Sequence, residues 1–144
     1  FEAEPGQVNE PNGHKYPTSS KCPTILFHEG KPFFTLGSPG AQTIVASVAQ
    51  TIINIIDYNM SLDEAIRDPR IYVTRDLETQ WEDGLEKEVL ESLKKLGYSF
   101  DQSFREQTAD TRLGDVQAIM IDQTNGHKLY GAADSPRPGG AEGL

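Results

Sequence analysis

The sequence predicts an α+β fold with a mainly antiparallel sheet, on three observations. Two short apolar segments, Ile25 to Phe27 and Pro32 to Leu36, flank a turn and are typical of a β-hairpin. An almost wholly apolar segment over residues 41–59 follows them and is long enough to form a buried helix. A second hairpin is expected late in the chain, with strands at residues 116–121 and 128–132. Strands, helices and strands in this order favour an antiparallel sheet with helices packed on its faces.

The expected helix at residues 41–59 carries a narrow polar stripe. Its members recur at spacings of four and three residues: Thr43, Ser47, Gln50, Asn54 and Asp57. This spacing places them along one line of the helix, and it predicts that the helix is buried on its other sides. Asn59 is expected to end the helix.

Between the two hairpins the sequence predicts a short helix and two strands. Ser61 and Glu64 have the spacing of a capping box, and the helix that they begin is expected to end before Pro69. Strands are expected at residues 71–74 and 77–81, around a turn at Arg75 and Asp76.

A further amphipathic helix is expected over residues 84–96, followed by Gly97 as its cap. Its apolar face consists of Leu85, Val89, Leu93 and Leu96. A strand is expected at residues 98–100 and a loop at residues 108–114. The whole chain, residues 1–144, is expected to be a single domain fragment. Its residues 1–14 are expected to form a loop and its residues 135–144 a loose tail.

Composition and charge exclude several functional classes. The chain has 144 residues and a net charge of −9 without a basic stripe, so it is not expected to bind nucleic acid. The one cysteine, Cys22, excludes an internal disulfide, and we expect it to pack as a small side chain rather than to act as a nucleophile. The three histidines lack the spacing of metal ligands. We therefore predict no metal, no cofactor and no membrane contact for this segment.

The segment Gly37-Ser38-Pro39-Gly40 leads from an expected strand directly into the apolar helix. Backbone N–H groups at a helix N-terminus lack intrahelical partners and lie at the positive end of the helix dipole. They suit a phosphate, a carboxylate or a developing oxyanion. A tight turn without any ligand is an equal alternative at this point. A nucleotide-binding loop is less well supported, because the Lys-Ser/Thr pair of such a loop is missing.

A second polar segment lies upstream, where Ser19 and Ser20 stand between Pro17 and Pro23. These serines enter the first hairpin, and the Gly-Ser-Pro-Gly turn leaves it. Because antiparallel strands of similar length return the chain to its starting point, both segments are expected at the same end of the hairpin. Two hydroxyls and a cluster of N–H groups would then face one pocket for an anion or an acyl group. The alternative is that the serines form only a hydrogen-bonded loop.

Several segments of the chain resemble γ-glutamyltranspeptidases, in the order that this family shows. Residues 17–24 resemble the family's segment of proline, paired serines, proline and threonine, and residues 37–41 resemble its Gly-Ser-Pro-Gly-Gly turn. Residues 129–137 are similar to its closing Leu-Tyr-Gly-Ala-Ser/Ala-Asp-Pro-Arg segment. The matching positions after the long helix are Asn54, Asp57, Tyr58, Met60, Glu64, Ala65, Ile66, Pro69 and Arg70.

The resemblance implies the four-layer αββα sandwich of N-terminal nucleophile hydrolases, with this chain supplying strands of one sheet and some covering helices. It also implies an autoprocessed precursor of a large and a small subunit. The N-terminal threonine of the small subunit attacks a γ-glutamyl amide such as glutathione, and the γ-glutamyl group then passes to water or to an amino acid. Phe1 has no nucleophilic group, so the threonine is expected upstream. The expected partners are therefore the large subunit and the N-terminal part of the small subunit.

The resemblance also implies roles for four residues. Gly40 and Ala41 would donate backbone N–H groups to the oxyanion, and Ser19 and Ser20 would bind the α-carboxylate of the substrate. Ala41 stands where the family has a second glycine, and Lys21-Cys22 replaces the usual Met-Ser. These departures leave open a related acylase with another acyl substrate, or a non-catalytic paralogue or binding module of the same fold. The resemblance fits a periplasmic or secreted location as well as a cytoplasmic one.

Overall fold

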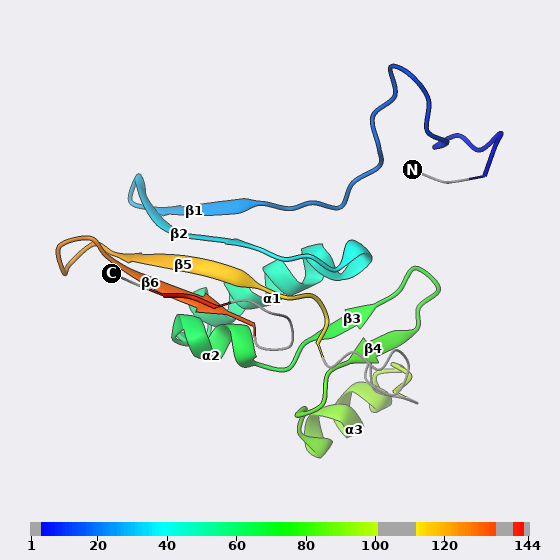
Figure 1. Cartoon of the computed structure of the whole chain (residues 1–144). Coiled ribbons are helices and arrows are strands. Elements are labelled where there is room, and N and C mark those ends of the chain that lie inside the picture. Colours follow the sequence, from blue (N-terminus) through cyan, green and yellow to red (C-terminus); the bar gives the residue numbers. More distant parts are fainter. Residues whose placement is uncertain (1–3, 101–111, 135–139, 143–144) are drawn as a thin grey trace.

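The computed structural model describes residues 4–100, 112–134 and 140–142. Its main body is a four-stranded antiparallel sheet with two helices on one face (Figure 1). The strands lie in the order β1 (Thr24–His28), β2 (Lys31–Gly37), β5 (Gln117–Asp122) and β6 (Lys128–Ala133). Both expected hairpins are confirmed, and they join through β2 and β5, where Leu36 lies opposite Ala118.

The chain leaves β2 through a 3-10 turn (Ala41–Thr43) and enters helix α1 (Ile44–Ile56). This helix ends before the expected Asn59. Asn59 has a φ of 54°, in the left-handed region, and the Met60 N–H turns back to donate to the Asn54 carbonyl oxygen at 3.0 Å. Left-handed residues commonly close the C-terminus of a helix in this way.

Helix α2 (Leu62–Arg67) begins with the expected capping box. The Ser61 hydroxyl accepts the Glu64 N–H at 3.4 Å, and the Glu64 carboxylate accepts the Ser61 N–H at 2.9 Å. Two backbone donors at the start of the helix are thereby satisfied.

Most of the polar stripe faces inward and only Asp57, after the end of α1, is exposed, so the expectation that the helix is buried on its other sides is wrong. Ser47 and Asn54 are only 1% and 8% exposed. The residues about half exposed on this helix are apolar: Val45, Ile53 and Ile56. The buried polar groups have partners, because Ser47 Oγ donates to the Leu113 carbonyl oxygen at 2.5 Å and Asn54 Nδ2 donates to Asp68 Oδ2 at 3.1 Å. Burial of polar side chains is tolerated where such hydrogen bonds are made.

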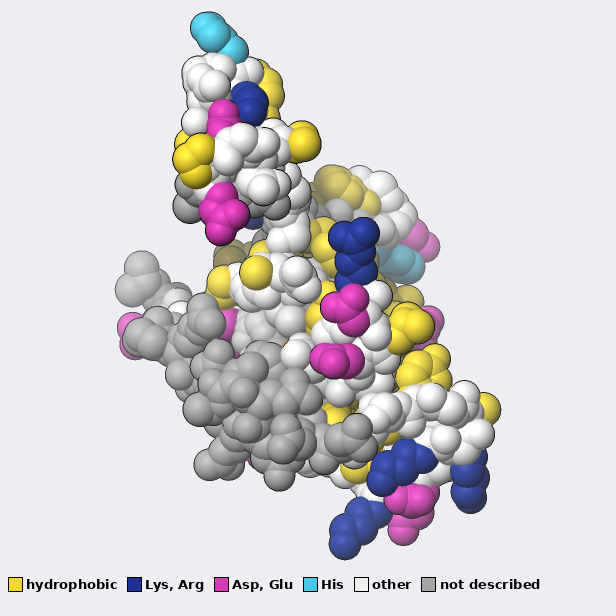
Figure 2. Space-filling view, turned by 90° about the vertical axis from the view of Figure 1, so that its right-hand side faces the viewer, with side chains coloured by type: hydrophobic (Ala, Val, Ile, Leu, Met, Phe, Trp, Pro, Cys, Tyr) yellow, Lys and Arg dark blue, Asp and Glu magenta, His cyan; other side chains and the backbone are white. Residues whose placement is uncertain are grey.

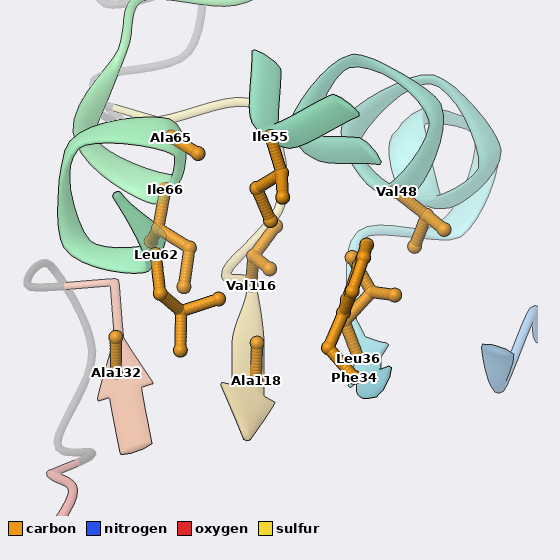
Figure 3. Packing of buried hydrophobic residues seen from close by; sticks show 10 residues of the cluster. All are labelled: Phe34, Leu36, Val48, Ile55, Leu62, Ala65, Ile66, Val116, Ala118 and Ala132. Atoms are coloured by element: carbon orange, nitrogen blue, oxygen red, sulfur yellow. The ribbon is translucent and has the colours of Figure 1, made fainter. Parts of the chain in front are cut away.

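The core lies between the two helices and the inner face of the sheet (Figure 3). Phe34 and Leu36 of β2 and Ala118 of β5 line the sheet side of this core. The other members are Val48, Ile55, Leu62, Ala65, Ile66, Val116 and Ala132. Full burial of a large apolar side chain contributes about 1.5–3 kcal/mol. This packing holds β2 and α1 together, and with them the turn that connects the two.

A second, smaller group of elements lies beside the sheet (Figure 1). It comprises β3 (Ile71–Val73), β4 (Thr79–Trp81) and α3 (Lys87–Lys95). Helix α3 is shorter than expected and buries none of its own residues, and Gly97, with a φ of 98°, follows its end. The expected strand at residues 98–100 is wrong. Phe100 instead turns inward and packs edge-on against Trp81, with ring centroids 5.2 Å apart.

Residues 4–23 form neither helix nor strand, and the first part of this segment stands away from the body (Figures 1 and 2). Val8 and Tyr16 within it are each 95% exposed. Most of the expected loop at residues 108–114 and most of the expected tail at residues 135–144 lie outside the described residues. No helix in the described part of the chain is long and apolar enough to cross a membrane.

Candidate active site

The turn between β2 and α1 contains two consecutive residues with positive φ, Gly40 at 138° and Ala41 at 51°. Their carbonyl oxygens accept the N–H groups of Thr43 and Ile44, so they begin the helix. The N–H groups of Gly40 and Ala41 have no acceptor within the described part of the chain. Ala41 is an exposed residue at this helix start, and unpaired backbone donors at a helix start are able to hold an anion.

Ser20 lies directly against this turn. Its hydroxyl donates to the carbonyl oxygen of Ala41 at 2.5 Å, a contact between residues 21 positions apart in the sequence. Ser19 Oγ accepts the Lys21 N–H at 3.2 Å, and no acceptor for the Ser19 hydroxyl hydrogen is found among the described residues. Both serines are exposed. The structure therefore brings the paired serines and the Gly40-Ala41 turn to one end of the β1–β2 hairpin.

Sequence reasoning predicted a loop at residues 108–114, but it missed that the described residues 112–116, which form the loop before β5, support this turn. Gly114, with a φ of 85°, packs against the Gly-Ser-Pro-Gly segment. The Asp115 N–H donates to Ser38 Oγ at 2.9 Å, and Ser38 Oγ donates to the Pro39 carbonyl oxygen at 2.7 Å. No local sequence pattern predicts these contacts, because 77 residues separate Ser38 from Asp115.

A buried cluster of four charged residues fixes the same loop. Arg70, Glu82 and Asp134 are each at most 2% exposed, and Arg112 joins them from the loop. Arg70 Nε lies 3.0 Å from Glu82 Oε1, and Arg70 Nη2 lies 2.5 Å from Asp134 Oδ2. Arg112 Nη1 lies 2.7 Å from Glu82 Oε2, and Arg112 Nε lies 3.1 Å from Asp134 Oδ1. The cluster thus connects the residues that follow β4 and β6 with Arg112 of the loop.

The environment of Glu82 in this cluster shifts the pKa of its carboxyl group. Burial raises the pKa of its carboxyl group above the ordinary value, while the positive charges of Arg70 and Arg112 and two backbone hydrogen bonds act in the opposite direction. One of those backbone donors is the Leu113 N–H, 2.5 Å from Glu82 Oε1. Sequence reasoning noted Arg70 and Asp134 only as positions of a family pattern, and it missed Glu82 and Arg112.

A hollow of about 1070 Å³ lies elsewhere, over the outer face of the sheet. Residues of β2, β5 and β6 and residues 140–142 line it, and it includes none of the four predicted site residues. Among the described residues, no group of three or more His, Cys, Asp and Glu side chains is placed to hold a metal ion.

The comparisons of this chain with known proteins agree on one protein family. The family model described as gamma-glutamyltranspeptidase matches residues 1–144. The chain is 44% identical over 144 residues to a glutathione hydrolase proenzyme of Bacillus subtilis, covering 100% of this chain and 23% of that protein. It is 33% identical over 105 residues to the acylase ACY 1 proenzyme of a Pseudomonas species, covering 73% of this chain and 19% of that protein.

The structure is similar to that of a mutant of Helicobacter pylori γ-glutamyltranspeptidase, with a TM-score of 0.78 and 35% identity. The match covers 92% of this chain and 69% of that chain. This likeness confirms the expected α+β fold, part of the αββα sandwich of N-terminal nucleophile hydrolases. The chain spans about a quarter or less of the length of the B. subtilis and Pseudomonas relatives. On its sequence and its fold, it belongs to the γ-glutamyltranspeptidase family.

Proposed function

We propose that this chain is the C-terminal part of the small subunit of an autoprocessed γ-glutamyltransferase and hydrolase. The whole protein would cleave γ-glutamyl amides of the glutathione type through a γ-glutamyl ester on a threonine outside this sequence. This proposal is supported by the 44% identity to a glutathione hydrolase proenzyme that is much longer than this chain. The observation that carries it furthest is the contact of the Ser20 hydroxyl with the Ala41 carbonyl oxygen, at 2.5 Å.

In this proposal, the N–H groups of Gly40 and Ala41 form the oxyanion hole. Attack on the γ-carbonyl carbon moves the carbonyl electron pair onto oxygen, and the negative oxygen then accepts both N–H groups. Donors that are already fixed before the reaction need no reorganisation as the charge develops. The start of α1 adds the positive end of a helix dipole at the same place.

Ser19 and Ser20 form the subsite for the α-carboxylate of the γ-glutamyl group in this proposal. The Ser19 hydroxyl hydrogen is free among the described residues, whereas the Ser20 hydroxyl hydrogen is given to Ala41. Ser19 therefore acts as the direct donor to the carboxylate. Ser20 also fixes Ala41, so it connects the carboxylate subsite to the oxyanion turn.

The partners in this proposal are the remaining parts of the same precursor, namely the large subunit and the N-terminal part of the small subunit. The outer face of the sheet exposes large apolar side chains, among them Ile25, Phe27, Ile119 and Leu129. Asp115 Oδ1 and Arg70 Nη1 are buried and have no hydrogen-bond partner among the described residues. Buried polar atoms normally have partners, so the partners of these two atoms are expected from segments other than the described residues.

Release of a chromogenic aniline from a γ-glutamyl anilide tests the proposal. The whole proenzyme should cleave itself and release the aniline, whereas residues 1–144 alone should not. Mass spectrometry of the whole protein should find two subunits, the smaller beginning with threonine. Turnover by residues 1–144 alone would place the nucleophile in this chain. A single uncleaved and inactive whole protein would favour a non-catalytic paralogue or binding module.

An acylase with another acyl group is the second candidate, favoured by Ala41 in place of the family's glycine and by 33% identity to an acylase proenzyme. The two activities are separated by a matched pair of substrates. A γ-glutamyl anilide carries an α-amino group that a glutaryl anilide lacks. A higher kcat/KM for the γ-glutamyl anilide supports the first candidate, and a higher value for the glutaryl anilide supports the second.

A further inference from the structure

The Gly-Ser-Pro-Gly turn rests on the backbone of the loop that precedes β5. A methyl group placed on Gly114 would lie 2.5 Å from Ser38 Oγ, 2.7 Å from Ser47 Oγ and 3.2 Å from the Pro39 carbonyl oxygen. A methyl group placed on Gly40 would lie 3.0 Å from the Gly114 Cα atom. The two glycines therefore pack backbone against backbone, at a distance that no side chain permits.

Ser38 is the polar connection between the turn and the loop. Its hydroxyl accepts the Asp115 N–H at 2.9 Å and donates to the Pro39 carbonyl oxygen at 2.7 Å. Ser47 of α1 reinforces the arrangement, because its hydroxyl oxygen lies within hydrogen-bond distance of the carbonyl oxygens of both Thr43 and Leu113, which share its single hydrogen. Movement of the loop would therefore disturb hydrogen bonds on both sides of Gly40.

The buried carboxylate of Glu82 and the end of α2 hold the loop in place. The Leu113 N–H and the Arg112 guanidinium both bind the buried carboxylate of Glu82. Arg112 also donates to the carbonyl oxygens of Ile66 and Arg67 at the end of α2. A buried ion pair with several hydrogen bonds tolerates little displacement of its members.

We propose that Ser38 and Gly114 are positioning residues, which act through Gly40 and Ala41 by holding their two N–H groups in the orientation that an oxyanion requires. Neither residue needs to touch the substrate. This inference rests on the proposed oxyanion role of Gly40 and Ala41. It extends that role by assigning the geometry of the turn to a loop more than 70 residues away in the sequence.

The test compares Gly114→Ala with Gly30→Ala in the whole proenzyme. Gly30 has a φ of 75°, close to the 85° of Gly114, but a methyl group on Gly30 would meet nothing within 4 Å. Both substitutions therefore impose similar backbone strain, and only the first displaces Ser38. We expect Gly114→Ala to lower kcat for the γ-glutamyl anilide at least tenfold with KM changed less than threefold. Gly30→Ala should leave both constants within twofold of the wild type.

Two further measurements guard against trivial loss of activity. Rates are expressed per cleaved enzyme, from the fraction of subunits separated on a denaturing gel, so that a defect in processing is not counted as a defect in kcat. Ser38→Ala removes the hydroxyl group and adds no atoms, and it decides the matter if Gly114→Ala fails to fold. We expect Ser38→Ala to lower kcat about fivefold or more, again with little change in KM.

Each remaining outcome overturns the inference. Wild-type kcat in a folded Ser38→Ala or Gly114→Ala variant would show that the turn does not depend on the loop. A rise in KM without a fall in kcat would assign the loop to substrate binding. An inactive wild type would remove the proposed function and this inference with it, whereas an active wild type with unaffected variants would remove this inference alone.

Discussion

Strand β2 has a turn with two positive-φ residues at each end, and the two turns differ in their surroundings. At the hairpin end, Glu29 and Gly30 have φ values of 50° and 75° and lie exposed, with open space around Gly30. At the other end, Gly40 and Ala41 have φ values of 138° and 51°. There, a methyl group on Gly40 would lie 2.5 Å from Thr43 Oγ1.

The difference separates a turn that only reverses the chain from a turn that is held in one geometry. Strained backbone persists where the surrounding structure determines it, and such places are enriched at functional sites. The hairpin turn is free to relax, since little packs against it. The Gly40 turn is held by contacts with α1, with Ser20 and with the loop before β5, which is the property that a preorganised set of donors needs.

The largest expected effect is a loss of stability, caused by removing Glu82 from the buried charged cluster that holds the loop against the Gly40-Ala41 turn. Glu82→Ala leaves Arg70 and Arg112 buried beside a missing carboxylate, and loss of one member of a buried ion pair costs about 3–5 kcal/mol. Urea denaturation of the whole protein measures the free energy of unfolding. The control is Asp63→Ala, which breaks the Asp63–Arg67 pair, whose side chains are more than half exposed, and should cost less than about 1 kcal/mol. Equal losses in the two variants would contradict the role of the cluster.

The next largest effect is expected on KM and kcat, and it should differ between variants of Ser19 and Ser20. Ser19→Ala should raise KM with kcat almost unchanged, because it removes only a donor to the carboxylate. Ser20→Ala should also lower kcat, because it releases the Ala41 carbonyl oxygen. A hydrogen bond to a charged group contributes about 1.5–3 kcal/mol, which is about 10- to 150-fold in kcat/KM. Steady-state kinetics with the γ-glutamyl anilide measures both constants, and identical changes in the two variants would show that Ser20 does not support the turn.

A smaller effect is expected at the left-handed residues of the two turns. Ala41→Gly and Glu29→Gly each relieve a positive φ in a non-glycine residue, so each should change stability by about 1 kcal/mol or less. Only Ala41→Gly should change kcat, by up to about tenfold, since it alters the flexibility of a proposed oxyanion donor. A matching change of kcat in Glu29→Gly would erase the distinction between the turns.

The smallest effect is expected away from both turns, at the cap of α2. Hydrogen bonds from Ser61 lower the pKa of Glu64, so its carboxylate stabilises the fold above its ordinary pKa. That contribution is lost as the pH falls through the lowered pKa. Glu64→Gln should therefore lower Tm by a few degrees at most at neutral pH, and the difference should vanish in acid. A difference in Tm that grows in acid would contradict this sign.

Local patterns predicted the elements that local interactions form. The β1–β2 hairpin and the capping box at Ser61 and Glu64 each depend on residues close in sequence, and both were predicted correctly. The inward orientation of the polar stripe on α1 was not predicted. It depends on acceptors such as the Leu113 carbonyl oxygen, which the sequence places 66 residues from Ser47.

The residues of the candidate site also fall into two groups, those predicted from the sequence and those that only the structure reveals. Ser19, Ser20, Gly40 and Ala41 were predicted as site residues, because the two ends of a hairpin meet and because a known family carries the same motifs. Gly114 and the Arg70–Glu82–Arg112–Asp134 cluster were missed as a structural unit. In the sequence, each of these five residues stands in a segment without a catalytic or binding motif of its own, and only the tertiary structure brings them together.

The central claim is that the Gly40-Ala41 turn and the paired serines form one site for a γ-glutamyl group. The most direct measurement is a crystal structure of the whole enzyme with a tetrahedral γ-glutamyl phosphonate bound to its nucleophile. We predict one phosphonate oxygen within about 2.7–3.1 Å of the backbone nitrogen atoms of both Gly40 and Ala41. We also predict that the α-carboxylate accepts the Ser19 hydroxyl group, while the Ser20 hydroxyl group still donates to the Ala41 carbonyl oxygen. An oxygen held by other donors, with the Gly40 and Ala41 N–H groups bonded to protein carbonyls, would contradict the account.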